Sequence, residues 1–491
     1  MTFMSAYFSR SLSLIFRHEL RVLHADRTLY WMAGLLLVLI GYSLFTGLAE
    51  TRTRDAAALD IAQRQVATQG ANIAAVRKVM AGKPPVDPFS NPVDPANMGG
   101  GLGARYAVMP TAPLAPLAFG QSDMFPNSYK VTYRSKVTFM YDSEMENPWN
   151  LLSGHLDLAF VMTYLLPLLI FATSYNLLSV EREQGTLRML LSQPLRLTTL
   201  VLGKVGARAA VLLGVAVLTP ALIAILVRPE VRESASILSL LAWMGLIVAY
   251  GVFWFALAVF VNSFGKSSAT NALILVSAWV ALVLIVPVVL NMVVQAQSPA
   301  PSRTELATRT RVITIQGLNR YNELLSADYR YAATPGILLP KDGKIVVPDR
   351  MRGHYLIQRD VDTEIETVLD RFDAQLAGQQ RLVDRYGVLS PAIIVYEGMT
   401  ALAGTGSKRY ASFQQQVDDF HALWKAYFDP RVMNGIAITE DDFARMPTFK
   451  WREPMQDGTV FATLQRMALL GFPVLVMLLV AAWRLKRMRI V

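Results

Sequence analysis

Six long runs of apolar residues divide the chain into membrane spans and connecting segments. A helix needs about 20 consecutive apolar residues to cross the hydrocarbon core of a bilayer. Runs of this length predict transmembrane helices over residues 29–49, 156–180, 207–227, 237–261, 270–294 and 464–483. The sixth run is the least regular, because Arg466 lies near its start. The pattern predicts a polytopic α-helical membrane protein with six transmembrane helices.

Positive charges cluster in the short segments on one side of these six spans. The four segments on this side carry arginine or lysine, and they cover residues 1–28, 181–206, 262–269 and 484–491. The positive-inside rule places such segments in the cytoplasm. Both termini are therefore expected to be cytoplasmic, with the chain in the inner membrane of a bacterium. Residues 8–23 also carry apolar side chains on one helical face, which predicts an amphipathic helix at the membrane surface.

The first of two long segments on the opposite side covers residues 50–155. It begins with a helical pattern over 56–80 and continues through a stretch rich in proline and glycine. Residues 129–140 then alternate between apolar and polar positions, which is typical of a strand.

The second long segment covers residues 295–463. Asp342-Gly343 predicts a hairpin turn, and 352–386 reads as a long polar helix with apolar residues at helical spacing. Two further helices are expected over 392–403 and 407–428. Both segments greatly exceed ordinary loop lengths, so we expect them to fold together as one α/β extracytoplasmic domain built from two insertions.

The composition agrees with a membrane protein and excludes several kinds of site. Hydrophobic residues make up 53% of the chain and charged residues 17%, against about 25% charged in soluble domains. The net charge of +10 is explained by the segments beside the spans, so no nucleic-acid partner is expected. The chain has no cysteine and only five scattered histidines, which excludes disulfides and argues against a metal site.

The segment after the second span carries the most informative pattern on the cytoplasmic side. A charged cluster is followed by a glycine and a short Leu-rich amphipathic helix, and the residues that carry this pattern are Glu181, Arg182, Glu183, Gly185, Thr186 and Leu187. Gly185 permits a tight turn, and Thr186 is expected to N-cap the helix that follows. On the residues alone, a solvated connecting loop remains the alternative.

This segment resembles the signature of ABC-2 type permeases, the membrane subunits of a class of ABC transporters. The resemblance rests on residues 181–194 followed by Leu202-Gly203-Lys204. Blocks at 112–126, 152–161 and 389–405 resemble a subset of the family with enlarged extracytoplasmic domains. The resemblance implies a coupling helix within 181–206 that docks on an ABC ATPase dimer, and a second permease protomer that is the same or a similar chain.

Gly265-Lys266-Ser267 resembles the end of a phosphate-binding loop, but the rest of that motif is missing. The motif requires a glycine five residues before Gly265, where this chain has Phe260. No cofactor is therefore expected on this chain, and ATP with Mg²⁺ is expected on the partner ATPase. Lys266 is instead predicted to be a second contact with that ATPase.

Three polar residues of the second span are candidates for a substrate pathway: Asp157, Tyr164 and Asn176. Ionisable groups within membrane segments are often functional, although hydrogen bonding between helices is the alternative explanation. Prolines within the spans are expected to kink them, namely Pro167, Pro220 and Pro287.

The sequence therefore predicts a permease subunit that couples ATP hydrolysis by a separate ATPase to export. The chain itself is not expected to be an enzyme. One alternative is a mechanotransmitter that acts on an envelope partner through its extracytoplasmic domain. Another is a membrane-anchored envelope protein that is unrelated to ABC transporters.

Overall fold

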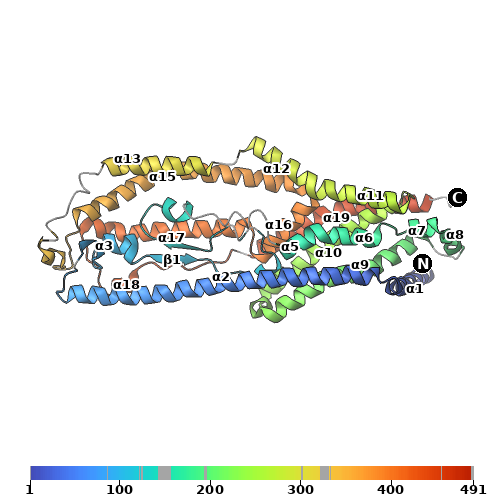
Figure 1. Cartoon of the computed structure of the whole chain (residues 1–491), viewed down its shortest axis with the longest axis horizontal. Helices are drawn as coiled ribbons and strands as arrows, with labels where there is room; N and C mark the ends of the chain where they lie inside the picture. Colours follow the sequence, from blue (N-terminus) through green and yellow to red (C-terminus); the bar gives the residue numbers. More distant parts are fainter. Residues whose placement is uncertain are drawn as a thin grey trace.

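The apolar runs form helices that gather at one end of an elongated molecule (Figure 1). The computed structural model describes residues 2–85, 87–120, 122, 125–141, 156–192, 196–299, 302–320, 331, 333–454 and 456–487. We call the apolar helices the bundle and the remainder the elongated domain. Helix α1 (Thr2–Asp26) and the last turns of α19 (Gln456–Arg487) lie at the end of the bundle farthest from the elongated domain, which we call the distal end.

Six helical segments among the described residues are long and apolar enough to cross a membrane. The bundle elements after α2 are α5 (Leu158–Phe160), η6 (Val161–Leu165), α6 (Leu166–Ser174), α7 (Ser179–Glu183), α8 (Thr186–Leu191), α9 (Leu197–Val227), α10 (Ser234–Asn262), α11 (Ser268–Trp279), η8 (Val280–Ile285), α12 (Val286–Gln297) and α19. The prediction of a polytopic helical membrane protein is confirmed. Helix α9 begins ten residues before the predicted start of the third span, and α19 begins eight before that of the sixth.

Prolines change the helical geometry in two of the six spans. Pro167 and Pro287 are each the second residue of the α-helix that follows a π-helical turn, η6 and η8. Proline lacks an N–H and its ring displaces the carbonyl four residues earlier, so the preceding turn widens. Pro220 differs, because it lies inside an uninterrupted α9.

Helix α10 and the span Leu158–Glu183 form the centre of the bundle, and 67% of the most apolar stretch of that span is buried. Trp243, Tyr250 and Trp254 have no exposed surface, and 61% of the most apolar stretch of α10 is buried. The corresponding fractions are only 11% for the span Ser268–Gln297 and 17% for Gly458–Arg487. Few residues of these two spans are fully buried by the described part of the chain.

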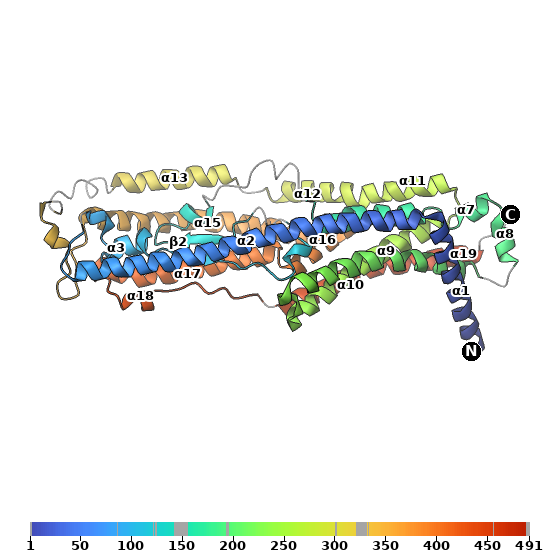
Figure 2. The ribbon, with the colours of Figure 1, turned by 60° about the horizontal axis from the view of Figure 1, so that its bottom comes forward.

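Helix α2 (Thr28–Met80) joins the bundle to the elongated domain (Figures 1 and 2). The sequence predicted a span ending at residue 49 and a separate helix over 56–80, whereas the structure has one helix of 53 residues. No proline interrupts the junction, and Arg54 Nε lies 3.2 Å from Glu50 Oε1 one turn earlier. At about 1.5 Å per residue the helix is roughly 80 Å long.

The main hydrophobic core of the elongated domain is built from both long segments, and a smaller cluster between α13 and α15 lies beside it. Val76 and Tyr133 come from the first segment, and Trp424 and Phe428 from the second. The expectation that both segments form one α/β domain is confirmed, although the sheet has only two strands. Among the described residues, the other α-helices of this domain are α3 (Pro95–Asn97), α13 (Arg303–Arg320), α15 (Asp349–Tyr386), α17 (Ser407–Asn434) and α18 (Asp442–Arg445). The short apolar helix α16 (Pro391–Ala403) also belongs to the bundle, because its buried residues pack in the bundle core.

The strand predicted over 129–140 is much shorter than expected. Strand β2 (Ser128–Val131) pairs antiparallel with β1 (Arg105–Val108), and Val131 lies opposite Arg105, the first residue of β1. Among the described residues no partner strand continues the ladder beyond Val131, and residues Val137–Tyr141 form a π-helical turn. At the predicted hairpin, Asp342 and Gly343 do have positive φ angles, but the flanking residues form only isolated bridges.

Candidate functional site

The distal end of the bundle brings together two exposed segments that are far apart in sequence. Arg182 Nη1 donates a hydrogen bond to the Gly265 carbonyl. The Glu183 carboxylate accepts from the Ser268 backbone N–H at 2.7 Å and from the Ser268 hydroxyl at 3.0 Å. Residues 181–192 and 263–268 therefore form one surface, which we call the distal surface (Figure 1).

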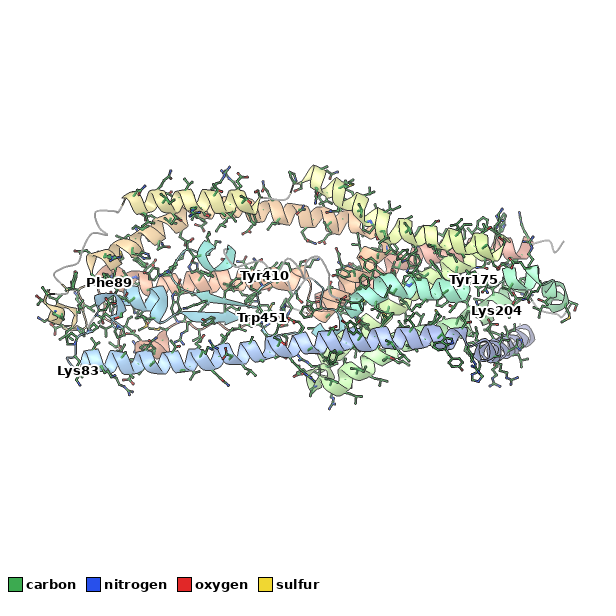
Figure 3. All side chains as sticks on the ribbon, viewed as in Figure 1. Lys83, Phe89, Tyr175, Lys204, Tyr410 and Trp451 are labelled. Atoms are coloured by element: carbon green, nitrogen blue, oxygen red, sulfur yellow. The ribbon has the colours of Figure 1, made fainter. Side chains whose placement is uncertain are left out.

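Glu181 points inward and fixes this surface to α9. Its Oε1 accepts a hydrogen bond from Lys204 Nζ, and Lys204 also donates to the Leu177 carbonyl at 3.2 Å. Lys204 is buried despite its charge, and Figure 3 places it near Tyr175 at the distal end. A buried ammonium requires such partners, so Glu181 holds α7 against α9.

The turn after α7 has the geometry that its glycine predicts. Gly185 adopts a φ of +73°, a conformation that favours glycine. Thr186 is the first residue of α8, but its hydroxyl donates to the Glu181 carbonyl at 3.3 Å, which differs from the predicted N-cap. Leu187 is buried in the bundle core, while Met189 is 72% exposed. Helix α8 therefore presents an exposed side at the distal end.

Lys266 is exposed in the turn between α10 and α11. Gly265 has a φ of +64°, and Ser267 caps α11 by accepting from the Thr270 N–H. Arg484 of α19 lies over the Phe264 ring at 4.0 Å. Residues 265–267 thus belong to a tight turn between two helices, with no strand before them, unlike a phosphate-binding loop.

Helix α1 crosses the distal end of the bundle and is anchored to α9 (Figure 2). Arg208 Nη2 lies 2.7 Å from Glu19 Oε1, and both side chains are at least 90% buried. Gly203 permits close contact, because a Cβ there would lie 2.5 Å from Ile15 Cγ2. Helix α1 and residues 181–192 are therefore both bound to α9, and residues 181–192 are also bound to the turn between α10 and α11.

The three pathway candidates do not form one site. Asp157 caps the start of α5, accepting from the Phe160 N–H at 2.7 Å, and also accepts from the backbone N–H groups of Phe119 and Gly120. These bonds account for a structural role. Asn176 lies in the turn before α7, at the opposite end of the same span. Tyr164 is the only one of the three that lines the large cavity described next.

A cavity of about 580 Å³ lies where the bundle meets the elongated domain. Its lining includes residues of α10, α12, α15, α16 and the first turns of α19. Arg466 Nη2 lies 2.9 Å from Glu397 Oε2, and Lys408 Nζ lies 3.6 Å from Asp384 Oδ2. The sequence analysis missed this site, although Glu397 is the lone carboxylate in the apolar helix α16 and was available as a signal.

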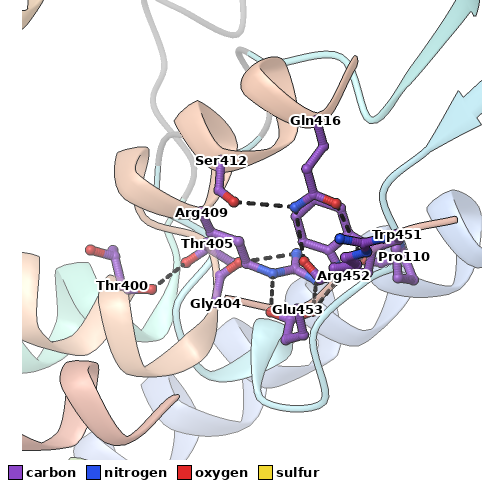
Figure 4. Close-up of polar contacts among 10 residues, drawn as sticks. All are labelled: Pro110, Thr400, Gly404, Thr405, Arg409, Ser412, Gln416, Trp451, Arg452 and Glu453. Atoms are coloured by element: carbon purple, nitrogen blue, oxygen red, sulfur yellow. Dashed lines mark hydrogen bonds and ion pairs between the residues drawn. The ribbon is translucent and has the colours of Figure 1, made fainter. Parts of the chain in front are cut away.

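Part of the cavity lining is a polar cluster centred on Arg409 (Figure 4). Arg409 makes two bonds to the Glu453 carboxylate, at 2.6 and 2.9 Å, and donates to the carbonyls of Gly404 and Pro110. The guanidinium also lies over the Trp451 ring. These contacts join α17 to the segment that leads into α19. Among the described residues, no group of three or more His, Asp or Glu side chains is placed to hold a metal ion.

The six spans and the domain built between them define a multi-pass membrane protein. The family model of the ABC-2 family transporter proteins matches residues 14–490, nearly the whole chain. The chain therefore belongs to this family, and the resemblance found in its sequence is confirmed. Members of the family are membrane components of ABC transporters. No curated protein matches the chain.

Proposed function

We propose that this chain is the permease subunit of an ABC exporter and that a separate ABC ATPase docks on the distal surface. The observation that carries the proposal is the pair of bonds from Arg182 to Gly265 and from Glu183 to Ser268. Two segments that the sequence predicted as separate ATPase contacts are one surface. ATP and Mg²⁺ belong to the ATPase dimer in this proposal.

The same bonds describe how a push on the distal surface would reach the spans. Glu183 is bound to the first turn of α11, where a carboxylate also interacts favourably with the helix dipole. Glu181 is bound to Lys204 of α9. Displacement of α7 and α8 would therefore move α9 and α11 together, and Leu187 would transmit it to the core around α10.

The orientation and the second protomer are part of the proposal. Both termini would lie in the cytoplasm and the elongated domain outside the inner membrane, as the distribution of positive charge indicates. Few residues of the spans Ser268–Gln297 and Gly458–Arg487 are fully buried by the described part of the chain. This favours a second permease protomer, identical or similar, beside at least one of them.

Mechanical transmission to an envelope partner is the second candidate function. Helix α2 favours it, because one uninterrupted helix extends from the distal half of the bundle along the elongated domain (Figure 1). Such a helix can pass a tilt of the spans to the far end of the domain. In this alternative the ATPase contact is the same, and the work is done on an extracytoplasmic partner.

The first experiment is a mild-detergent purification of the intact chain with identification of the proteins that copurify. An ABC ATPase is expected with the unaltered chain and is expected to be weakened by Met189→Asp and Lys266→Glu, which alter exposed positions of the distal surface. Glu440→Ala is the matched control, because Glu440 forms an exposed ion pair with Arg77 in the elongated domain. Absence of any ATPase from folded protein would contradict the proposal.

A proline in the outer half of α2 separates the two candidate functions. Ala67 is exposed on α2, and proline there removes a helical hydrogen bond and bends the helix. Mechanical transmission predicts that Ala67→Pro retains ATPase binding but abolishes ATP-dependent changes in hydrogen exchange across α17. If those changes persist at their original size, α2 is not the transmitting element.

A further inference from the structure

The cavity at the junction of the two parts is built from dissimilar walls. The spans contribute mainly uncharged residues, among them Tyr164, Ser239 and Pro287. The elongated domain contributes charged residues, namely Asp384, Lys408, Arg409 and Glu453. The first turns of α10 and α19 line the cavity, so it lies at the boundary of the membrane. An amphipathic molecule at this depth has its polar part outside the apolar layer and its apolar part within it.

The size of the cavity suits a small ligand. Its volume of about 580 Å³ lies within the range of roughly 300–1,000 Å³ that is usual for small-molecule sites. It is lined by apolar side chains such as Leu114 and Ile393 together with a few charged groups. This combination is typical of a binding site, and the volume favours one alkyl chain over two.

The charged groups differ in how firmly they are bound within the protein. Arg409 is held by four hydrogen bonds to Glu453, Gly404 and Pro110, so it is structural (Figure 4). Lys408 instead makes a loose pair with Asp384 at 3.6 Å, and its side chain is 74% exposed. An exposed pair of this kind contributes about 0–1 kcal/mol, and it is easily exchanged for a ligand group.

The second pair, between Glu397 and Arg466, joins α16 to α19 across the cavity. One Arg466 nitrogen donates to Glu397 at 2.9 Å, and the two side chains are 26% and 21% exposed. The cavity lining holds three carboxylates and three cations. Arg409 and Glu453 are bound to each other, which leaves two carboxylates and two cations for a ligand, namely Asp384, Glu397, Lys408 and Arg466. An anionic ligand that bound the two cations would leave the carboxylates without a counter-charge. A cationic ligand that bound the carboxylates would leave the two cations without one. Either outcome is costly in a partly buried site.

We propose that this cavity binds a single-chain amphipathic molecule with a zwitterionic head, of the lysophospholipid class. The anionic group of the head pairs with Lys408 and Arg466, and its cationic group pairs with Asp384 and Glu397. Every protein charge thereby keeps a partner of opposite sign. The alkyl chain lies against the uncharged wall formed by the spans. This inference concerns a ligand site and does not depend on where the ATPase docks.

The test uses the full chain in lipid nanodiscs and a 12-carbon lysophosphatidylcholine that carries a photoreactive group in its alkyl chain. Mass spectrometry maps the adducts. We expect adducts on residues 391–403 and 458–466, and we expect unlabelled lysophosphatidylcholine to compete at least tenfold better than lysophosphatidylglycerol or dodecyltrimethylammonium. Equal competition by all three, or adducts only on the outer faces of the spans, would overturn the proposal.

Two variants separate specific binding from loss of folding. Lys408→Gln changes an exposed side chain and is expected to weaken competition by lysophosphatidylcholine at least fivefold without altering thermal unfolding. Ala462→Trp fills the cavity and is expected to abolish the adducts. Arg77→Gln, at an exposed ion pair in the elongated domain, is the control and should leave both unchanged. Unchanged labelling in Lys408→Gln and in folded Ala462→Trp would refute the site.

Discussion

The buried ion pair between Glu19 and Arg208 predicts how firmly α1 is attached to the bundle. Its atoms lie 2.7 Å apart, and the Glu19 and Arg208 residues are 5% and 7% exposed. Removal of one partner from such a pair leaves an uncompensated buried charge and costs about 3–5 kcal/mol. Arg208 would keep its bond to the Thr173 carbonyl, so we expect a cost of about 3 kcal/mol for Glu19→Leu.

The size of this effect can be measured as the opening of α1. The chain has no cysteine, so Leu23→Cys introduces a unique thiol at a buried position of α1. Because each 1.4 kcal/mol is about a tenfold change in an equilibrium constant, Glu19→Leu should accelerate maleimide labelling of this thiol by about 100-fold. The double variant Glu19→Leu/Arg208→Met removes both charges and should label within about fivefold of the unaltered pair.

The control is the exposed ion pair between Arg64 and Asp60, whose atoms are 2.8 Å apart. Exposed pairs contribute about 0–1 kcal/mol, so Asp60→Leu should change labelling less than about fivefold. If Glu19→Leu behaves like Asp60→Leu, or if the double variant labels as fast as Glu19→Leu, the ion pair does not hold α1 in place and the reasoning is refuted.

Three further predictions concern single residues. Burial raises the pKa of Asp94 to about 7, so the contribution of Asp94 to stability is present below pH 4 and is lost as pH rises through 7. Residues 91–103 should therefore be better protected from hydrogen exchange at pH 5 than at pH 8 after correction for intrinsic rates. Asp94→Asn should remove this difference. Gly435 has a φ of +61°, and an added Cβ would lie 2.5 Å from the Ile345 carbonyl oxygen. Gly82 has a φ of +84°, but no atom lies within 4 Å of an added Cβ there. Gly435→Ala should therefore lower the unfolding temperature clearly more than Gly82→Ala, and equal effects would show that the clash is absent. Asp157 accepts three backbone hydrogen bonds, so Asp157→Ala should cost about 2–3 kcal/mol in thermal unfolding, whereas a pathway role predicts altered transport at unchanged stability.

The features that the sequence predicted best are those set by local composition. Apolar runs of span length leave a helix as the main way to satisfy the backbone in a membrane, so the six spans could be found from hydropathy alone. The turn at Gly185 was also predictable, because its positive φ favours glycine.

The errors arose where distant parts of the chain decide the local structure. The strand over 129–140 has the right alternation, yet it ends at Val131 because the partner strand begins at Arg105. The helical patterns of the first span and of residues 56–80 were read separately, whereas they belong to one helix, because a polar stretch can continue a helix when nothing breaks it. Sequence patterns do not report the partner strand or the continuity of a helix.

The candidate site shows the same division. The exposed residues around Glu183 and Lys266 were found as two segments, but the bond from Glu183 to Ser268 joins positions 85 residues apart and was not predictable. The charged pair Glu397–Arg466 spans 69 residues and was missed entirely. Both depend on how α11, α16 and α19 pack.

The central claim, that a separate ABC ATPase docks on the distal surface, is tested most directly by photo-crosslinking in intact cells. A photoreactive amino acid replaces Met189, which is 72% exposed on α8, or Leu59, which is 65% exposed on α2. Leu59 lies near Gln65, whose side chain accepts a hydrogen bond from the Tyr106 N–H of β1 in the elongated domain. The account predicts an adduct with an ABC ATPase from position 189 and none from position 59. An ATPase adduct from position 59, or none from position 189 in correctly folded protein, would contradict it.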